Sequence, residues 1–106
     1  MWDSIRFVGC VEGVAMALVN LSEEGIVEIC YEGHSVMCIG PQITLPKGSN
    51  MIQLNCKKFI GKGFKIWMRV VDTSSTYIRN ECSSRVDKLH HLVGTIIMPE
   101  RVVRMG

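Results

Sequence analysis

The chain has 106 residues, of which 47% are hydrophobic and 21% are charged, and its formal net charge at pH 7 is +2. This length predicts one domain or two very small ones, and the composition excludes a disordered chain. No apolar run approaches the ~20 residues of a membrane-spanning helix, and the first residues lack the basic start of a signal peptide. We therefore expect a protein of the cytoplasm, the nucleus or both, with no membrane partner.

Short segments rich in β-branched and aromatic residues follow one another along the chain, separated by Gly, Asn, Ser or Pro. Such segments are typical of strands. In chain order, the predicted strands are 5–8, 15–19, 26–31, 36–39, 51–56, 64–71, 76–78, 93–98 and 101–104. The stretch 83–92 places Val86 and Leu89 at helical spacing and is predicted as one short helix or as a structured loop. We expect an all-β fold of small antiparallel barrel or sandwich type, with at most that one helix.

Charge divides the chain into two unequal parts. Residues 1–46 carry a net charge of −5, whereas residues 47–106 carry +7. Pro41 and Pro46, together with Gly40 and Gly48, interrupt the segment between the two parts. We predict an acidic β half at 1–40, a linker at 41–50 and a basic β half at 51–106.

Residues that could carry catalysis or bind a metal do not form a recognisable pattern. The five cysteines are an odd number with no close pair, which predicts reduced, buried thiols in place of a disulfide framework or a zinc site. The adjacent His90 and His91 would point to opposite faces of a strand. Gly61-Lys62-Gly63 lacks the ending of a phosphate-binding loop and favours a tight turn. We expect no enzyme activity, no cofactor and no metal.

A weak internal repeat runs through both halves. Segment 25–29, a turn at 32–35 and segment 36–40 are mirrored by segment 94–98, a turn at 99–100 and segment 101–106. This order resembles the Sm/LSm family, whose members form a strongly bent five-stranded barrel from two sequence blocks. Segments 51–54, 63–72 and 76–78 fall in the places of the first block, and 93–103 is similar to the second. The resemblance implies one Sm-like barrel or two abbreviated Sm-like halves.

The residues with which that family reads RNA are replaced in this chain. Thr76 stands at the position of the Asn of the first block, and Pro99-Glu100 stand where the second block has Arg-Gly. A carboxylate there would repel a phosphodiester chain. RNA reading through the usual site is therefore not expected, although contact with RNA through the basic C-terminal half stays open.

An Sm-type barrel without its RNA-binding residues still has its sheet edges, and Sm-type subunits pair with one another through these edges. The Gemin-type Sm-like subunits of the survival-motor-neuron complex are of this kind, and segment 15–25 is similar to a strand and turn of one such subunit. The resemblance implies a non-enzymatic scaffold or assembly factor of ribonucleoprotein (snRNP-type) biogenesis, in a homo- or hetero-oligomer with Sm-like or other β-edge partners. The expected partner-interface residues are Val27, Ile29, Val36, Ile96, Ile97, Val102 and Val103.

Two alternatives remain open. An oligonucleotide-binding barrel would use a basic segment with interleaved aromatics, which could follow a single strand and stack its bases. Its candidate nucleic-acid-binding residues are Lys57, Lys58, Lys62, Lys65, Trp67 and Arg69. The same aromatics could instead be core residues with the lysines outside. A viral jelly-roll structural protein is the second alternative, because many short strands would suit it.

Overall fold

The computed structural model describes residues 3–32, 36–37, 42–56, 65–74, 76–85 and 99–105. Its strands are β1 (Ser4–Val11), β2 (Val14–Leu21), β3 (Gly25–Glu32), β4 (Val36–Met37), β5 (Gln42–Leu45), β6 (Gly48–Asn55), β7 (Lys65–Val71), β8 (Ile78–Arg85) and β9 (Arg101–Met105). The described residues contain no helix, so the all-β prediction is confirmed. Of the stretch 83–92, the first three residues belong to β8, and 86–92 lie outside the described residues.

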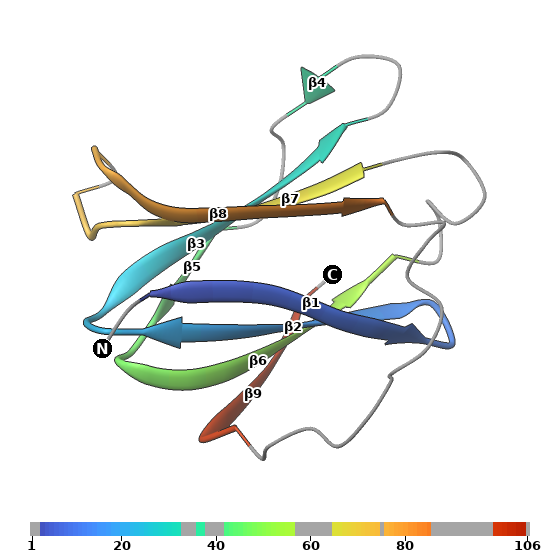
Figure 1. Ribbon diagram of the computed structural model, residues 1–106, viewed down its shortest axis with the longest axis horizontal. Helices are drawn as coiled ribbons and strands as arrows, with labels where there is room; N and C mark the ends of the chain where they lie inside the picture. The colour runs from blue at the N-terminus through green and yellow to red at the C-terminus, as the bar shows by residue number, and fades with distance from the viewer. Residues whose placement is uncertain are drawn as a thin grey trace.

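The strands form two sheets that face each other (Figure 1). Sheet I has the order β1-β2-β6-β9, in which β9 runs parallel to β6 and the other pairs are antiparallel. Sheet II has the order β4-β3-β7-β8, and β5 pairs with the edge of β3 that it shares with β4. In the part of the chain that the structure describes, no ladder joins the two sheets into a closed barrel.

The order in which the strands alternate between the two sheets is that of a known type of β-sandwich. Strands β1, β2 and β6 on one sheet, and β3, β7 and β8 on the other, are arranged like strands A, B, E and C, F, G of immunoglobulin-type sandwiches. Strand β9 occupies the place of strand D beside β6, but it comes from the C-terminal end of the chain and is parallel. The strand order is thus that of a Greek-key sandwich with a C-terminal strand added at one edge.

Both sheets combine strands from the acidic and the basic parts of the chain. Strand β2 pairs with β6 along its whole length, and β3 pairs with β7. The segment predicted as a linker, 41–50, contains β5 and the beginning of β6. The acidic and basic parts of the chain are therefore not separate units in space, because strands from both parts pair within each sheet.

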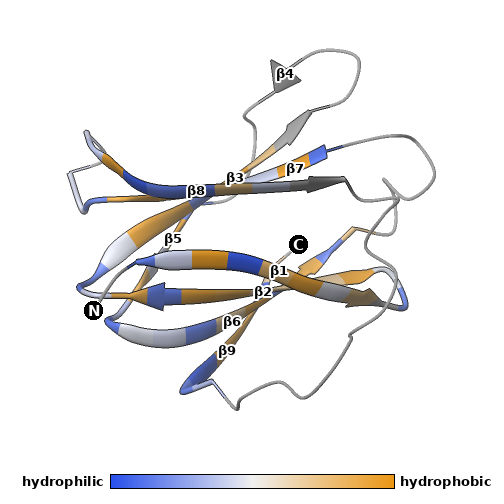
Figure 2. Cartoon of the chain, in the orientation of Figure 1, coloured by the Kyte–Doolittle hydropathy of each residue, from blue (hydrophilic) through white to orange (hydrophobic). Residues whose placement is uncertain are grey.

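The core lies between the sheets and is built by alternation along each strand. In β2 every second residue is buried, namely Ala15, Ala17, Val19 and Leu21. The facing side chains come from sheet II, where Val27, Ile66 and Met68 are fully buried. Figure 2 shows hydrophobic residues spread over the strands of both sheets. Such burial removes apolar surface from water and is the main force that holds two sheets together.

The hairpin between β1 and β2 depends on two residues with positive φ. Glu12 has φ 51° and Gly13 has φ 80°, which is the pattern of a type I′ turn with a two-residue loop. Upstream, the register shifts between Phe7 and Gly9, and Gly9 has φ 150°. A bulge at this glycine increases the local twist of β1.

Candidate functional site

Strand β9 forms one open edge of sheet I. It pairs with β6 in parallel register, from Asn50 opposite Arg101 to Leu54 opposite Met105. Among the described residues, no strand pairs with its other side. In an edge strand, alternate residues direct their N–H and C=O groups away from the sheet, where they can pair with another chain. The open side of β9 is therefore a candidate interaction site.

Side chains of β9 alternate between the core and the surface. Val103 and Met105 are half-buried and pack against the core cluster. Val102 and Arg104 lie on the outer face of sheet I, and Val102 is 52% exposed. An exposed valine on an edge strand adds apolar surface to unpaired backbone groups, and both features favour strand addition.

The start of β9 is held by the corner between β5 and β6. The backbone N–H of Glu100 donates to the backbone oxygen of Ser49 at 3.1 Å and to its hydroxyl oxygen at 3.0 Å. Arg101 Nη1 donates to the backbone oxygen of Lys47 at 3.3 Å. Gly48 has φ 115°, and a Cβ added there would clash with the Glu100 carboxylate. These contacts fix the position of β9 in addition to its ladder with β6.

Asn50 connects this corner to both strands. Its side chain is fully buried, and Nδ2 donates to the backbone oxygen of Gly48 at 3.2 Å, with those of Pro46 and Val19 at 3.3 and 3.4 Å. Its Oδ1 accepts from Arg101 Nη1 at 3.4 Å. A buried amide must find such partners, because an unpaired one is strongly destabilising. Asn50 thus links the β5–β6 corner, β2 and the start of β9.

The two arginines of β9 turn back toward β6. Arg101 reaches the corner and Asn50, and Arg104 Nε donates to Gln53 Oε1 at 3.3 Å. Charged side chains on an edge strand commonly prevent another chain from pairing with it. Here both arginines make their hydrogen bonds on the β6 side, so they do not cover the unpaired backbone groups on the open side of β9.

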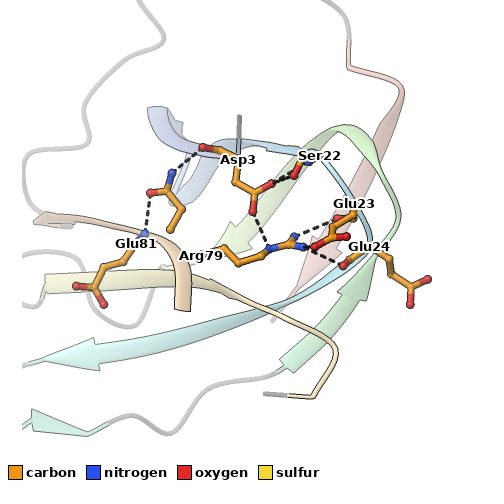
Figure 3. A network of polar contacts seen from close by, with 7 residues as sticks. Asp3, Ser22, Glu23, Glu24, Arg79 and Glu81 are labelled. Carbon is orange, nitrogen blue, oxygen red and sulfur yellow. Dashed lines mark hydrogen bonds and ion pairs between the residues drawn. The ribbon is translucent and has the colours of Figure 1, made fainter. Parts of the chain in front are cut away.

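Side-chain contacts link the start of β1 to β8, although no ladder joins these two strands in the described part of the chain. These two strands lie side by side, and Asn80 Nδ2 donates to the backbone oxygen of Asp3 at 2.7 Å (Figure 3). Arg79 Nε lies 2.6 Å from Asp3 Oδ2, and both side chains are 8% exposed. Asp3 Oδ1 accepts from the backbone N–H and the hydroxyl of Ser22, both at 2.8 Å. These contacts tie the N-terminal end of β1 to β8 and to the β2–β3 connection.

Arg79 also binds the connection between β2 and β3. Its Nη2 donates to the backbone oxygen of Glu23 at 3.0 Å, and its Nη1 donates to that of Glu24 at 3.1 Å (Figure 3). Nη1 lies 3.3 Å from Glu23 Oε1 as well. One guanidinium from sheet II thus holds the turn that connects the two sheets, and we assign this cluster a structural role.

The predicted partner-interface residues are distributed over different environments. Val27 and Ile29 are 0% and 1% exposed on β3, a central strand with partners on both sides, so their side chains belong to the core and not to an edge. Val36 lies on β4. Ile96 and Ile97 lie outside the described residues. Val102 and Val103 lie on the open edge strand, where Val102 is exposed and Val103 packs against the core.

The candidate nucleic-acid-binding residues that are described engage other side chains of the chain. Lys65 Nζ lies 5.1 Å from the centre of the Trp67 ring, and Arg69 Nε lies 3.1 Å from Glu81 Oε2. All three candidates lie on the outer face of β7, which is a central strand of sheet II. Lys57, Lys58 and Lys62 lie outside the described residues.

Of the segments predicted to fall in the first Sm block, 51–54 belong to β6 and 65–71 to β7, whereas Asp72 and Thr76 lie in the turn between β7 and β8. Asp72 Oδ1 accepts from the Ser74 hydroxyl at 2.7 Å and from the Thr76 backbone N–H at 3.1 Å. The hydrogen bond from Ser74 lowers the pKa of Asp72 below its usual value, with the backbone N–H groups adding to the effect. The turn therefore satisfies its own polar groups.

Cysteines in the described part of the chain are free thiols. Cys10, Cys30 and Cys56 are buried, and Cys82 is half-buried. Within the described ranges, no group of three His, Cys, Asp or Glu side chains could hold a metal ion. No helix among these residues has the length and apolar character needed to cross a membrane.

Comparisons with known proteins identify no relative of this chain. No family model matches it, and neither the curated proteins nor the solved structures contain a significant match. What this protein does must therefore be inferred from the geometry and chemistry of the site itself.

Proposed function

We propose that this protein is a non-enzymatic interaction module that binds an extended segment of a partner protein as an added strand on the open edge of β9. The observation that carries this proposal is the pairing of β9 on one side only among the described residues. An added strand would hydrogen-bond with the outward backbone groups, which supplies affinity, while the alternating side chains supply specificity.

The anchoring of β9 supports the same proposal. Because Glu100, Arg101 and Asn50 hold the start of the strand, little ordering of β9 would be needed when a partner binds. Binding to a fixed edge avoids the entropic penalty of ordering a mobile segment. Strand β5, the other open edge on this side, has only four residues and is followed by Pro46, which makes it a poorer template.

The side chains of β9 define what a partner strand would meet. On the outer face its residues would lie beside Val102 and Arg104, and on the inner face beside Val103 and Met105. A suitable segment therefore alternates, with apolar residues toward the core side and a polar or acidic residue near Arg104. The partner class implied by the Sm/LSm resemblance, Sm-like proteins in ribonucleoprotein assembly, stays a prediction, and strand addition does not depend on it.

A library of ten-residue extended peptides tests this mode of binding. Selected peptides should slow the amide hydrogen exchange of alternate residues in 101–105, because only outward N–H groups gain a new acceptor. Exchange in the free protein identifies these outward groups in advance, since they are the unprotected ones. Protection confined to other strands would contradict the proposal.

Val102→Pro and Val103→Pro form a matched pair for the same test. Consecutive residues direct their N–H groups to opposite sides, so one variant loses an outward donor and the other loses a donor to β6. The outward variant should keep its urea midpoint and lose peptide binding by at least tenfold. If the outward variant is folded and binds normally, the edge is not the interface.

A further inference from the structure

The outer face of sheet I carries apolar side chains along β2 and arginines on the edge strands β1 and β9. One row across the sheet joins Arg6, Leu18, Met51 and Val102, as the strand registers show. The next row joins Gly9, Met16, Gln53 and Arg104. Leu18 and Met16 are half-buried, and Val102 is 52% exposed. Outer faces of sandwiches normally alternate to polar residues, so an apolar stripe here indicates a contact surface.

Met51 lies at the centre of this stripe. It is 4% exposed although it points away from the inter-sheet core cluster, to which it does not belong. Its neighbours in the row, Leu18 and Val102, lie on either side of it. At this exposure Met51 offers almost no surface to a partner, so the accessible apolar residues of the face are Leu18, Met16 and Val102.

The charges on this face have one sign. Arg6 on β1 and Arg104 on β9 are exposed, and the described strand residues of this face include no carboxylate. No ion pair involves either arginine within the described residues. The outer face of sheet II differs, because Arg69 there is paired with Glu81 and Glu28 accepts from Gln42. The face of sheet I is therefore complementary to a partner with acidic flanks.

A hollow of about 340 Å³ lies at one end of the face. Its lining residues are Val14, Gln53, Asn55, Arg104 and Met105. The Arg104 guanidinium is oriented by its hydrogen bond to Gln53. A guanidinium beside apolar walls is suited to a carboxylate carried on a short aliphatic stem.

We propose that the outer face of sheet I binds an acidic amphipathic helix of a partner protein. The apolar stripe of that helix packs along Leu18, Met16 and Val102, and carboxylates on its two flanks pair with Arg6 and Arg104. The Arg104 partner is an Asp or Glu that enters the hollow. This surface shares Val102 and Arg104 with the proposed edge site, whereas Arg6 and Leu18 lie on β1 and β2, so variants at these two residues test the face alone.

The distance between β1 and β9 and the positive charge of both strands favour a helix as the partner element. The strands β1 and β9 are three inter-strand spacings apart, about 14 Å, and a helix with side chains is about 10–12 Å wide. A helix that lies along the strands therefore fits between the two arginines. A second copy of this chain, stacked face to face, would place arginines against arginines.

The test uses a displayed helical scaffold with leucines on one face and random residues at the flanking positions. Selection on the wild-type protein should enrich Asp and Glu at both flanks. The double variant Arg6→Glu/Arg104→Glu should bind these acidic helices at least tenfold more weakly than the wild type does. It should bind helices with Lys at the flanking positions more tightly. Both substituted residues are exposed, so the fold should be retained. Lys65→Glu, on the opposite sheet, is the matched control and should leave binding unchanged.

Leu18→Asn separates the apolar contact from the charges. It should weaken acidic and Lys-flanked helices alike, with a urea midpoint that shows the variant is folded. The proposal is overturned if no selected helix maps to this face by chemical-shift changes, or if the charge reversal has no effect. It is also overturned if single-stranded RNA alone occupies the face, or if Leu18→Asn dissolves a homodimer.

Discussion

Asp3 and Arg79 form a buried ion pair that joins the two sheets, with Oδ2 and Nε 2.6 Å apart. Asp3 directly precedes β1 on sheet I, and Arg79 belongs to β8 on sheet II. The same guanidinium binds the β2–β3 connection through two backbone oxygens (Figure 3). The pair therefore ties the N-terminal end of sheet I to an edge strand of sheet II, on the side of sheet I opposite β9.

The ion pair should be a major contributor to stability. We expect Arg79→Met to lower the free energy of unfolding by about 3 kcal/mol, because it leaves the Asp3 carboxylate buried without its cation. In the double variant with Asp3→Asn, the loss should be smaller than the sum of the two single losses. Urea unfolding measures each value. Arg69→Met is the control, since its pair with Glu81 is partly exposed and should contribute less than about 1 kcal/mol. Equal losses at Arg79 and Arg69 would contradict the assigned role.

Gly25 leaves space for the Arg79 guanidinium. A Cβ added to Gly25 would clash with Arg79 Nη2 and would lie 3.0 Å from the backbone oxygen of Val71. We expect Gly25→Ala to lower the free energy of unfolding by about 1–3 kcal/mol, as overpacking usually does. Thermal or urea unfolding in the Arg79→Met background should show a smaller loss, because only the Val71 contact remains. Strictly additive effects would show that the two residues do not compete for this space.

Two substitutions in the β1–β2 turn should change the unfolding free energy in opposite directions. At Glu12, φ 51° suits asparagine better than glutamate, so Glu12→Asn should raise the unfolding free energy by about 0.5 kcal/mol. At Gly13, φ 80° disfavours any side chain, so Gly13→Ala should lower it by about 1 kcal/mol or more. Calorimetry can measure both changes. The same sign for both variants would exclude a type I′ turn.

The Cys56 thiol should make stability depend on alkaline pH. Burial raises the pKa of Cys56 from 9.0 to about 11, and a hydrogen bond with the Ala15 backbone partly opposes this. Because the folded state holds the proton more tightly than the unfolded state, the contribution is complete below pH 9 and is lost as the pH rises toward 11. Urea unfolding of wild type and Cys56→Ala across this window isolates the effect. The difference in unfolding free energy between the two proteins should shrink with rising pH. A constant difference would contradict the proposed role of the Cys56 thiol.

Several strands could be predicted because their signals are local. Alternation of apolar and polar residues located β2, β3 and β7 to within two residues, and Gly13 marks the turn before β2. Strand β5 was missed because its short segment is flanked by prolines and reads as a linker. Strand β8 was only partly predicted, since the polar run 79–85 lacks the β-branched residues that indicate a strand.

The candidate site could be predicted only in part. Val102 and Val103 were predicted as interface residues and lie on β9, whereas Val27 and Ile29, predicted likewise, lie in the core. Residue type does not distinguish a central from an edge strand, because that depends on which strands lie on either side. Asp3, Asn50 and Arg79 gave no signal at all, since their partners are distant in the sequence and match no motif.

By itself, the sequence determined that the chain forms short strands and where most of them lie. These are properties of neighbouring residues, set by backbone preference and by the burial of alternate apolar side chains. Only the tertiary structure decided that β9 runs parallel to β6 at an edge, that β1 and β8 lie close together on the other side, and that arginines flank an apolar face. Pairings between distant strands arise from the packing of the whole core, so no local pattern records them.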